Sequence, residues 1–283
     1  MWNQKLCLAL SGQFGIDDAS QIKLFAETGF DGFFSGWSHD APIAEWKALA
    51  DEYGMMYQSI HAPFGNSAKM WSFDKSVSLP AVNELLDCLH DCAANEVPIM
   101  VCHTFIGFKD HSPTDAGIEN YEAVAREAER LGVMLGFENT EGEEYLAAVM
   151  TLSSAYKSVG FCWDTGHEMC YNHSKDMTAL YGDRLICTHL NDNLGIRDSG
   201  GEITWIDDLH LLPFDGIADW DSITARLAAH NFSGPLTFEL NTQSKPGRHE
   251  NDCYAKLPIE EYISEVYKRA CRVGALFRKH LSK

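Results

Sequence analysis

Histidine and carboxylate side chains follow short apolar runs at six places along the sequence, and others lie in the loops behind these runs. Imidazole and carboxylate groups bind divalent cations and transfer protons, so their repeated use at equivalent places indicates metal or acid–base chemistry. Each one alone has an ordinary explanation, since a lone histidine is usually structural and a carboxylate often caps a helix. The set consists of His61, His103, Glu138, Asp164, His167, His189, Asp208, His210 and Glu239.

The apolar runs predict buried parallel strands, because most of them are continuous rather than alternating with polar residues. Segments with helical spacing of apolar residues lie between them. The predicted strands are 6–10, 32–35, 56–61, 99–105, 133–139, 160–164, 185–191 and 236–240. The predicted helices are 17–28, 41–53, 79–94, 116–131, 143–156, 174–181, 220–230 and 259–280.

Eight strands that alternate with eight helices predict an α/β fold, a single (β/α)8 TIM barrel over residues 1–283. No Pro-, Gly- or Ser-rich linker divides the chain. A doubly wound sheet is the rival fold, but no Gly-x-Gly-x-x-Gly motif follows the first strand. Residues 192–219 form a long loop rich in Asp, Gly and aromatic residues, where a functional role is expected. In a TIM barrel the active site lies at the carboxyl ends of the strands, where the nine candidates are predicted to meet.

Nine such side chains at one barrel mouth would repel one another or stay unpaired unless a cation neutralised them. The sequence therefore predicts a metal site. Nitrogen and oxygen ligands favour Zn²⁺ or Mn²⁺, with Co²⁺, Fe²⁺ and Mg²⁺ as further candidates. Cys102 and Cys162 are expected to be ordinary buried strand residues, whereas alternation along the seventh strand places Cys187 on the same side as His189.

Charge and composition restrict the partners. The chain carries 41 acidic and 22 basic residues, a net charge of −19, which argues against a nucleic-acid binder. It contains no run of about 18 apolar residues and no recognisable secretory signal, so neither a membrane span nor export is expected. Nine cysteines without a Cys-x-x-Cys pair are typical of reduced thiols, and a cytoplasmic location is expected.

Four short motifs, in this order along the chain, make the sequence similar to the xylose isomerase-like TIM barrels, which include sugar isomerases, sugar epimerases and endonuclease IV. The motifs are Glu138-Asn139-Thr140, Asp164-Thr165-Gly166-His167, His189-Leu190-Asn191-Asp192 and Glu239. The resemblance spans most of the chain, and it implies a divalent ion held by Glu138, Asp164, His189 and Glu239. It also implies substrate contacts by His167 and Glu144, although Glu144 equally fits the acidic first turn of a helix.

By this resemblance the protein is expected to be a metal-dependent isomerase or epimerase of a sugar or polyol-derived ketone. The ion would stabilise an enediolate, while Glu138 and Glu239 remove and return the proton. Few basic residues lie near the strand ends, which favours an unphosphorylated substrate. Further predicted substrate contacts are His61, His103 and Arg197. The aromatic residues expected either to wall the pocket or to pack in the core are Phe64, Phe105, Trp163 and Trp205.

Two alternatives stay open. The endonuclease IV pattern of three zinc ions adds His61, His103, His167, Asp208 and His210 to the four ligands, and all five are present. The acidic segments 141–144 and 207–208 would repel a DNA backbone, however. A barrel that binds a ligand or partner chain without catalysis is the other alternative. A homo-oligomer is compatible with the apolar residues 1–2 and with the C-terminal helix.

Overall fold

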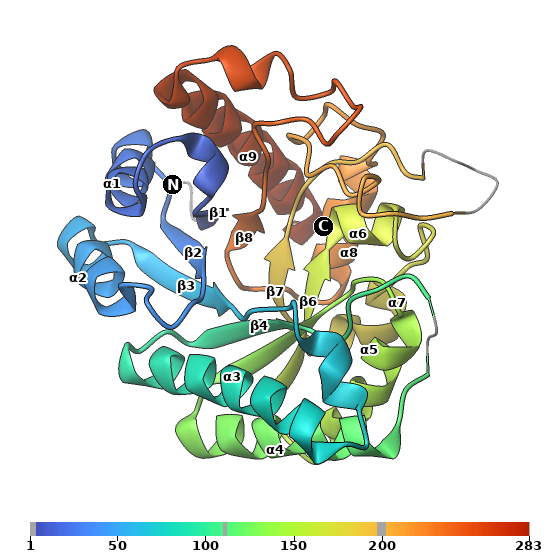
Figure 1. Ribbon diagram of the computed structural model, residues 1–283. Coiled ribbons are helices and arrows are strands. Elements are labelled where there is room, and N and C mark those ends of the chain that lie inside the picture. Colours follow the sequence, from blue (N-terminus) through green and yellow to red (C-terminus); the bar gives the residue numbers. More distant parts are fainter. Residues whose placement is uncertain (1–3, 110–111, 197–201, 283) are drawn as a thin grey trace.

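Eight parallel strands form a barrel in the computed structural model, which describes residues 4–109, 112–196 and 202–282 (Figure 1). Their order is β7-β6-β5-β4-β3-β2-β1-β8. A parallel bridge between Leu190, directly after β7, and Phe238 of β8 joins the two ends of this order. The predicted (β/α)8 barrel is therefore confirmed. The strands are β1 Leu6–Ala9, β2 Gly32–Gly36, β3 Met56–His61, β4 Ile99–His103, β5 Met134–Glu138, β6 Val159–Asp164, β7 Leu185–His189 and β8 Leu236–Phe238.

Burial on both faces explains why the strand sequences are continuous apolar runs. Strands β1 and β6 are buried along their whole length. One face of each strand fills the barrel and the other packs against helices. A small apolar cluster of Val101, Cys162 and Cys187 is separate from the main core. Strand alternation places this cluster inside the barrel, one layer below the polar residues at the strand ends.

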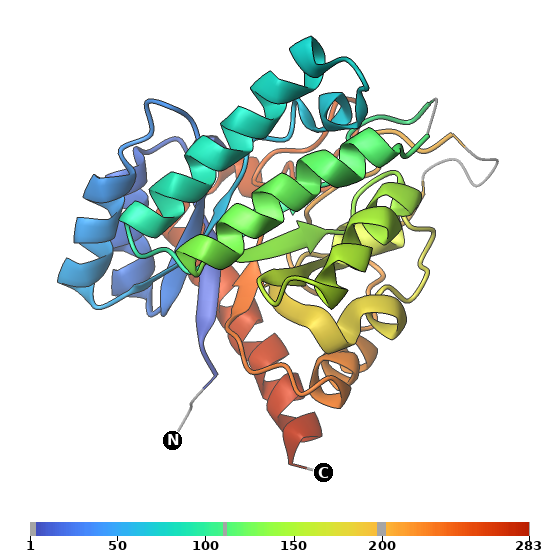
Figure 2. The ribbon, with the colours of Figure 1, turned by 90° about the horizontal axis from the view of Figure 1, so that it is seen from below.

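The helices surround the barrel, and Figure 2 shows α3 and α4 side by side on one flank. Helix α9 packs against α8 and α1, next to β1 and β8. Local signals define the helix ends: Asp17 accepts a hydrogen bond from the Ser20 amide at 2.9 Å at the start of α1, and Gly29 ends it with φ of 111°. The helices are α1 Asp18–Thr28, α2 Ile43–Tyr53, α3 Lys75–Ala94, α4 Asp115–Leu131, α5 Glu143–Met150, α6 Thr165–Met169, α7 Thr178–Tyr181, α8 Trp220–Ala229 and α9 Ile259–Leu281.

Three predicted helices differ from the structure by more than two residues in extent. Helix α3 begins four residues before the predicted start, because Asp74 caps it by accepting from the Ser76 amide at 2.8 Å. The predicted helix 143–156 is wrong in its second half, where a 3₁₀ turn, Thr151–Ser154, follows α5. The predicted helix 174–181 begins only at α7, next to a hydrogen bond that the Asp176 carboxylate accepts from the Ala179 amide at 2.9 Å. Helix α6 was not predicted.

The long loop after β7 contains no helix in its described part, as predicted. It returns to the barrel mouth through an antiparallel bridge between Asp192 and Leu211. Across the described ranges, none of the helices combines the length and apolar character that a membrane crossing requires.

Candidate metal centre

The carboxyl ends of the strands open into a pocket of about 630 Å³. Six of the nine predicted side chains line it, namely His61, His103, His167, Asp208, His210 and Glu239. Glu138, Asp164 and His189 are fully buried beside them. A larger cavity, of about 800 Å³, lies between the C-terminal helix and residues 231–233 and contains none of the nine candidates.

The nine side chains form three groups in which the potential ligand atoms all lie within 4.8 Å of one another. The groups are Glu138/Asp164/His189/Glu239, His61/His103/Glu138 and His167/Asp208/His210. Glu138 belongs to two of them. The structure thus brings together every residue of the predicted set, and their roles as ligands or catalysts stay predictions.

Glu138, at the end of β5, is surrounded by four imidazoles. Its Oε2 atom lies 3.2 Å from Nε2 of His61 and 3.3 Å from Nε2 of His103. Its Oε1 atom lies 3.2 Å from Nδ1 of His189 and 3.3 Å from Nδ1 of His167. Burial disfavours the charged carboxylate, but His189, His103 and His167 outweigh this effect and hold the pKa of Glu138 well below its usual value.

His189, at the end of β7, lies between two carboxylates and an aromatic ring. Its Nδ1 atom is 3.1 Å from Oε2 of Glu239 as well as 3.2 Å from Glu138. Phe34 stacks on the imidazole, with ring centroids 4.6 Å apart and planes 9° from parallel. Burial opposes protonation, but Glu138 and Glu239 raise the pKa of His189 well above its usual value. The Nε2 atom is completely buried, and the Cys187 thiol is a further hydrogen-bonding neighbour of this imidazole.

Asp164, at the end of β6, connects the centre to two neighbouring segments. One carboxylate oxygen accepts from the His167 amide at 2.7 Å, which caps α6, and the other accepts from Nδ2 of Asn191 at 2.9 Å. The cap explains why a short helix begins here and why His167 is aimed at the pocket. Burial raises the pKa of Asp164 to about 6, and Glu138 adds to this effect against the opposing charge of His167. A cation bound among these carboxylates would favour their charged forms.

Asp208 and His210 come from the long loop rather than from a strand end. Oδ2 of Asp208 lies 2.9 Å from Nε2 of His210, and its Oδ1 atom lies 3.6 Å from Nε2 of His167. Burial lowers the pKa of His210, but Asp208 and Glu239 outweigh it and raise the pKa to about 9. Oδ1 of Asp208 is buried and has no hydrogen-bond partner among the described residues, which is what a cation-binding oxygen would show before its ion is added.

Asp192 has a structural role, although it belongs to a motif of the predicted site. Its buried carboxylate accepts hydrogen bonds at 2.9 Å from the amides of Asn193, Phe214 and Ala218 and from Nε1 of Trp220. The two ends of the long loop are therefore joined at one side chain. This connection holds the segment that carries Asp208 and His210 over the strand ends.

Some predicted contacts lie elsewhere. Glu144 is exposed and lines an adjacent cavity of about 590 Å³ rather than the pocket of the nine side chains. Trp163 is fully buried and donates to Glu168 at 2.9 Å, with Arg226 over its ring, so it packs outside the pocket. Phe105 stacks on Tyr145 with ring centroids 4.0 Å apart. Arg197 lies outside the described residues.

Aromatic and cationic side chains complete the lining of the pocket. Phe64 and Trp205, both predicted as wall residues, do line it. Tyr171 and Lys245 also line it and were not predicted. Nζ of Lys245 lies 3.7 Å from Oδ2 of Asp208 and 5.4 Å from the ring centroid of Trp205. Tyr171 and Lys245 do not directly follow a strand. The pattern of polar residues at strand ends, which identified the other site residues, therefore could not predict them.

Comparison with known proteins agrees with this architecture. A sequence model of a family described as xylose isomerase-like TIM barrel matches residues 22–261. A protein of Sinorhizobium fredii, uncharacterized protein y4fM, is 37% identical over 135 residues. That match covers 45% of this chain and 40% of the Sinorhizobium protein, so this chain spans less than half the length of that relative.

Three solved structures have similar folds at low sequence identity. The IOLI protein with a bound zinc atom has a TM-score of 0.74 and 17% identity, covering 99% of this chain and 100% of its own. The barrel and 4-hydroxyphenylpyruvate dioxygenase fusion protein has a TM-score of 0.73 and 13% identity, with 99% of this chain and 44% of that chain covered. The 3-keto-D-glucoside 4-epimerase YcjR of E. coli has a TM-score of 0.68 and 15% identity, with coverage of 95% and 100%. At these identities the likeness shows the fold.

Proposed function

The chain belongs to the xylose isomerase-like TIM barrel family, and from this premise we propose that it is a metal-dependent isomerase or epimerase of a sugar-like small molecule. One observation carries the proposal. Glu138, Asp164, His189 and Glu239 form a compact group of potential ligands next to the pocket. The 3-keto-D-glucoside 4-epimerase and the zinc-containing protein among the structures of the same fold support it.

The donors of this group suit a divalent ion. Three carboxylates and one imidazole provide the oxygen and nitrogen atoms that Zn²⁺ or Mn²⁺ prefers. A bound ion would supply the positive charge that acidifies a C–H bond next to a carbonyl. His167, His61 and His103 line the pocket beside the group, and we assign them to the substrate oxygens.

The two glutamates differ in their access to the pocket. The side chain of Glu239 is 30% exposed and lines the pocket, whereas Glu138 is fully buried among imidazoles. We therefore assign to Glu239 the removal of a proton from the substrate carbon. Glu138 contacts the same imidazole nitrogen as Glu239 and is the carboxylate proposed to return a proton, which changes the stereocentre or shifts the carbonyl.

The experiment is a hydrogen-exchange assay in heavy water. Metal-loaded protein is incubated with a panel of unphosphorylated ketoses and keto-sugars, and the recovered sugar is analysed by mass spectrometry. Removal and return of a carbon-bound proton adds one mass unit of deuterium to the substrate or product, even where the equilibrium favours the starting sugar. Glu239→Gln should abolish the exchange while metal binding by the other residues persists. Full deuterium exchange by the Glu239→Gln variant would contradict the role of Glu239. Absence of exchange by the wild type with every sugar of the panel would contradict the proposed activity.

A second candidate is a phosphodiester hydrolase with three metal ions. It is favoured by the groups His61/His103/Glu138 and His167/Asp208/His210, which could hold two further ions that an epimerase with one metal ion does not need. The net charge of −19 and the acidic cavity formed by residues 141–144 oppose binding of a polyanion. Elemental analysis of protein purified without chelator separates the candidates: about one ion per chain supports the epimerase, and about three zinc ions make cleavage of abasic-site DNA at low salt the next assay.

A further inference from the structure

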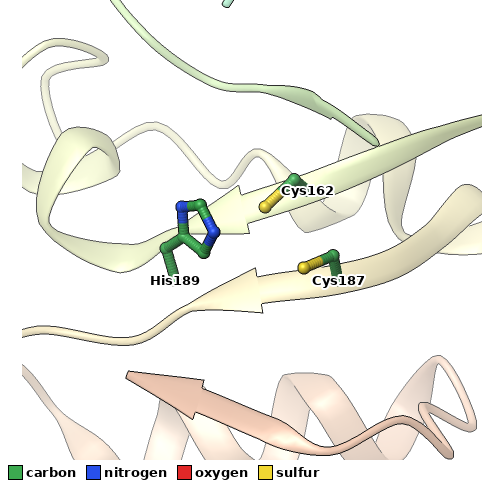
Figure 3. Close-up of side chains that lie close together, drawn as sticks. All are labelled: Cys162, Cys187 and His189. Atoms are coloured by element: carbon green, nitrogen blue, oxygen red, sulfur yellow. The ribbon is translucent and has the colours of Figure 1, made fainter. Parts of the chain in front are cut away.

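Two cysteines lie side by side inside the barrel, one layer below the carboxylates. A register shift between β6 and β7 occurs after Phe161, which pairs with Leu185, so that Cys162 pairs with Cys187 instead of Ile186. Without this irregularity the two thiols would not be direct neighbours. Both side chains are fully buried, and Figure 3 shows their sulfur atoms near each other on neighbouring strands, on the side where His189 lies.

His189 follows Cys187 by two residues and therefore points to the same side of β7. Its Nδ1 atom faces Glu138 and Glu239, whereas its other ring nitrogen, Nε2, is completely buried on the side of Cys187, whose thiol is a further hydrogen-bonding neighbour of this imidazole. Figure 3 shows one ring nitrogen directed to the side on which the two sulfur atoms lie. One ring nitrogen of His189 thus faces the carboxylates beside the pocket, and the other faces the two thiols.

We propose that Sγ of Cys162, Sγ of Cys187 and Nε2 of His189 form a binding site for a thiophilic metal ion such as Zn²⁺, Cd²⁺ or Cu⁺. The potential ligand atoms of these three residues lie within 4.8 Å of one another. An ion about 2.3 Å from sulfur and about 2.0 Å from nitrogen needs ligands roughly 4 Å apart. Small side-chain rotations therefore suffice to close the site around an ion.

The surroundings favour a soft ion over a hard one. Ile99, Val101 and Ile186 pack around the thiols and offer no oxygen ligand. Nε2 of Gln58 donates to Sγ of Cys187 at 3.1 Å, which stabilises negative charge on that sulfur. Two sulfur ligands select Zn²⁺, Cd²⁺ or Cu⁺ and disfavour Mg²⁺ and Mn²⁺. Binding would release the two thiol protons to solvent.

This site goes beyond the proposed function and does not depend on it, although the two share His189. The competing explanation is that Nε2–H of His189 donates to Cys187 and that the thiols bind no metal. Metal ligation by Nδ1 commonly leaves the other ring nitrogen as such a donor. A measurement that distinguishes sulfur ligands from oxygen and nitrogen ligands separates the two explanations.

The first test is ¹¹³Cd NMR on the wild-type protein after chelator treatment and stepwise addition of Cd²⁺. We expect one resonance in the range of cadmium bound by oxygen and nitrogen, and a second one in the range of cadmium bound by thiolates. A spectrum with only the first resonance would overturn the proposal and leave the thiols as hydrogen-bond partners. Absence of the oxygen and nitrogen resonance would instead count against the proposed function, so the two failures are distinguishable.

Variants then locate the thiolate signal, followed as thiolate-to-metal charge-transfer absorption. Cys162→Ser and Cys187→Ser should each abolish it. Cys88→Ser is the matched control, because Cys88 is equally buried but lies in α3, outside the barrel. Asp164→Asn removes a carboxylate of the Glu138/Asp164/His189/Glu239 group and should keep the thiolate absorption. A thiolate absorption that survives both barrel substitutions would refute the site, and the wild-type NMR result stands even where a variant does not fold.

Discussion

Nδ1 of His189 lies 3.2 Å from Oε1 of Glu138, and both side chains are completely buried. In a low-dielectric interior, this carboxylate is the counter-charge for the imidazoles around it. The pair also connects three of the four potential metal-binding groups, because Glu138 belongs to two of them and His189 belongs to the group with Cys162 and Cys187 as well. A change at Glu138 should therefore affect more than one ion or substrate contact.

Glu138→Gln tests this dependence. The amide keeps the size of the side chain but brings two N–H donors toward imidazole nitrogens and removes a negative charge. We expect metal affinity to fall by more than roughly tenfold, which is the lower range even for residues that only support a ligand. Competition with a fluorescent chelator measures the affinity. Glu144→Gln, at an exposed position of α5, is the control, and equal affinities of the two variants would contradict the assignment.

His210 gives a pH dependence in the metal-free protein. Its pKa is raised from 6.5 to about 9, with burial opposed by Asp208. A raised pKa means that the folded state holds the proton more tightly. The stabilisation is therefore complete below pH 6.5 and is lost as the pH rises toward 9. The contribution is at most about 3 kcal/mol.

Urea unfolding of chelator-treated protein between pH 6 and pH 10 checks this effect. His210→Gln should show a smaller loss of stability across that window than the wild type. His249→Gln replaces an exposed histidine, 84% accessible in its side chain, and should follow the wild-type curve. Parallel curves for His210→Gln and wild type would show that His210 does not contribute in this way.

Trp205 is expected to bind the apolar face of a sugar. It lines the pocket, remains 53% exposed and lies next to Lys245. Trp205→Ala should raise KM by roughly tenfold with little change in kcat, since ring stacking is worth about 1 kcal/mol or slightly more. Phe73→Ala removes a more exposed aromatic residue that does not line the pocket and should change neither value. A fall in kcat alone for Trp205→Ala would contradict a binding role.

Asp192→Asn should destabilise the fold and displace the loop. The amide nitrogen would face N–H donors in place of one carboxylate oxygen, which leaves buried groups unsatisfied at a cost of about 1–3 kcal/mol each. Thermal unfolding measures the loss. Asp221→Asn, which breaks an exposed ion pair with Lys279, should cost less than about 1 kcal/mol. If Asp192→Asn matched that control, the loop would not depend on this side chain.

The apolar character of buried parallel strands made both the strands and the pocket residues that follow them predictable. Buried parallel strands must be apolar, so a histidine or carboxylate at the end of such a run stands out; strand β3 has the predicted bounds, from Met56 to His61. Alternation along the seventh strand also predicted that Cys187 lies on the same side as His189. The short helix α6 escaped prediction because its start depends on the cap formed by Asp164, a residue interpreted as a ligand.

Other features depend on distant parts of the chain. Lys245 reaches the pocket from the segment after β8, and its position relative to Asp208 follows from the path of two loops. The hydrogen bonds of Asp192 join residues up to 28 positions apart. The proximity of Cys162 to Cys187 follows from an irregular strand register. No local pattern of residue types in the sequence predicts any of these three contacts.

The pairing of β1 with β8 has a consequence for synthesis on the ribosome. Leu6 is paired with Leu236, which the ribosome adds 230 residues later. At about 5–20 residues per second, this interval lasts roughly ten to forty-five seconds. During this time one edge of β1 lacks its partner strand, and an unpaired apolar edge is a template for association with other chains. A chaperone that covers residues 6–9 of the nascent chain should therefore raise the yield of folded protein more than one added after release.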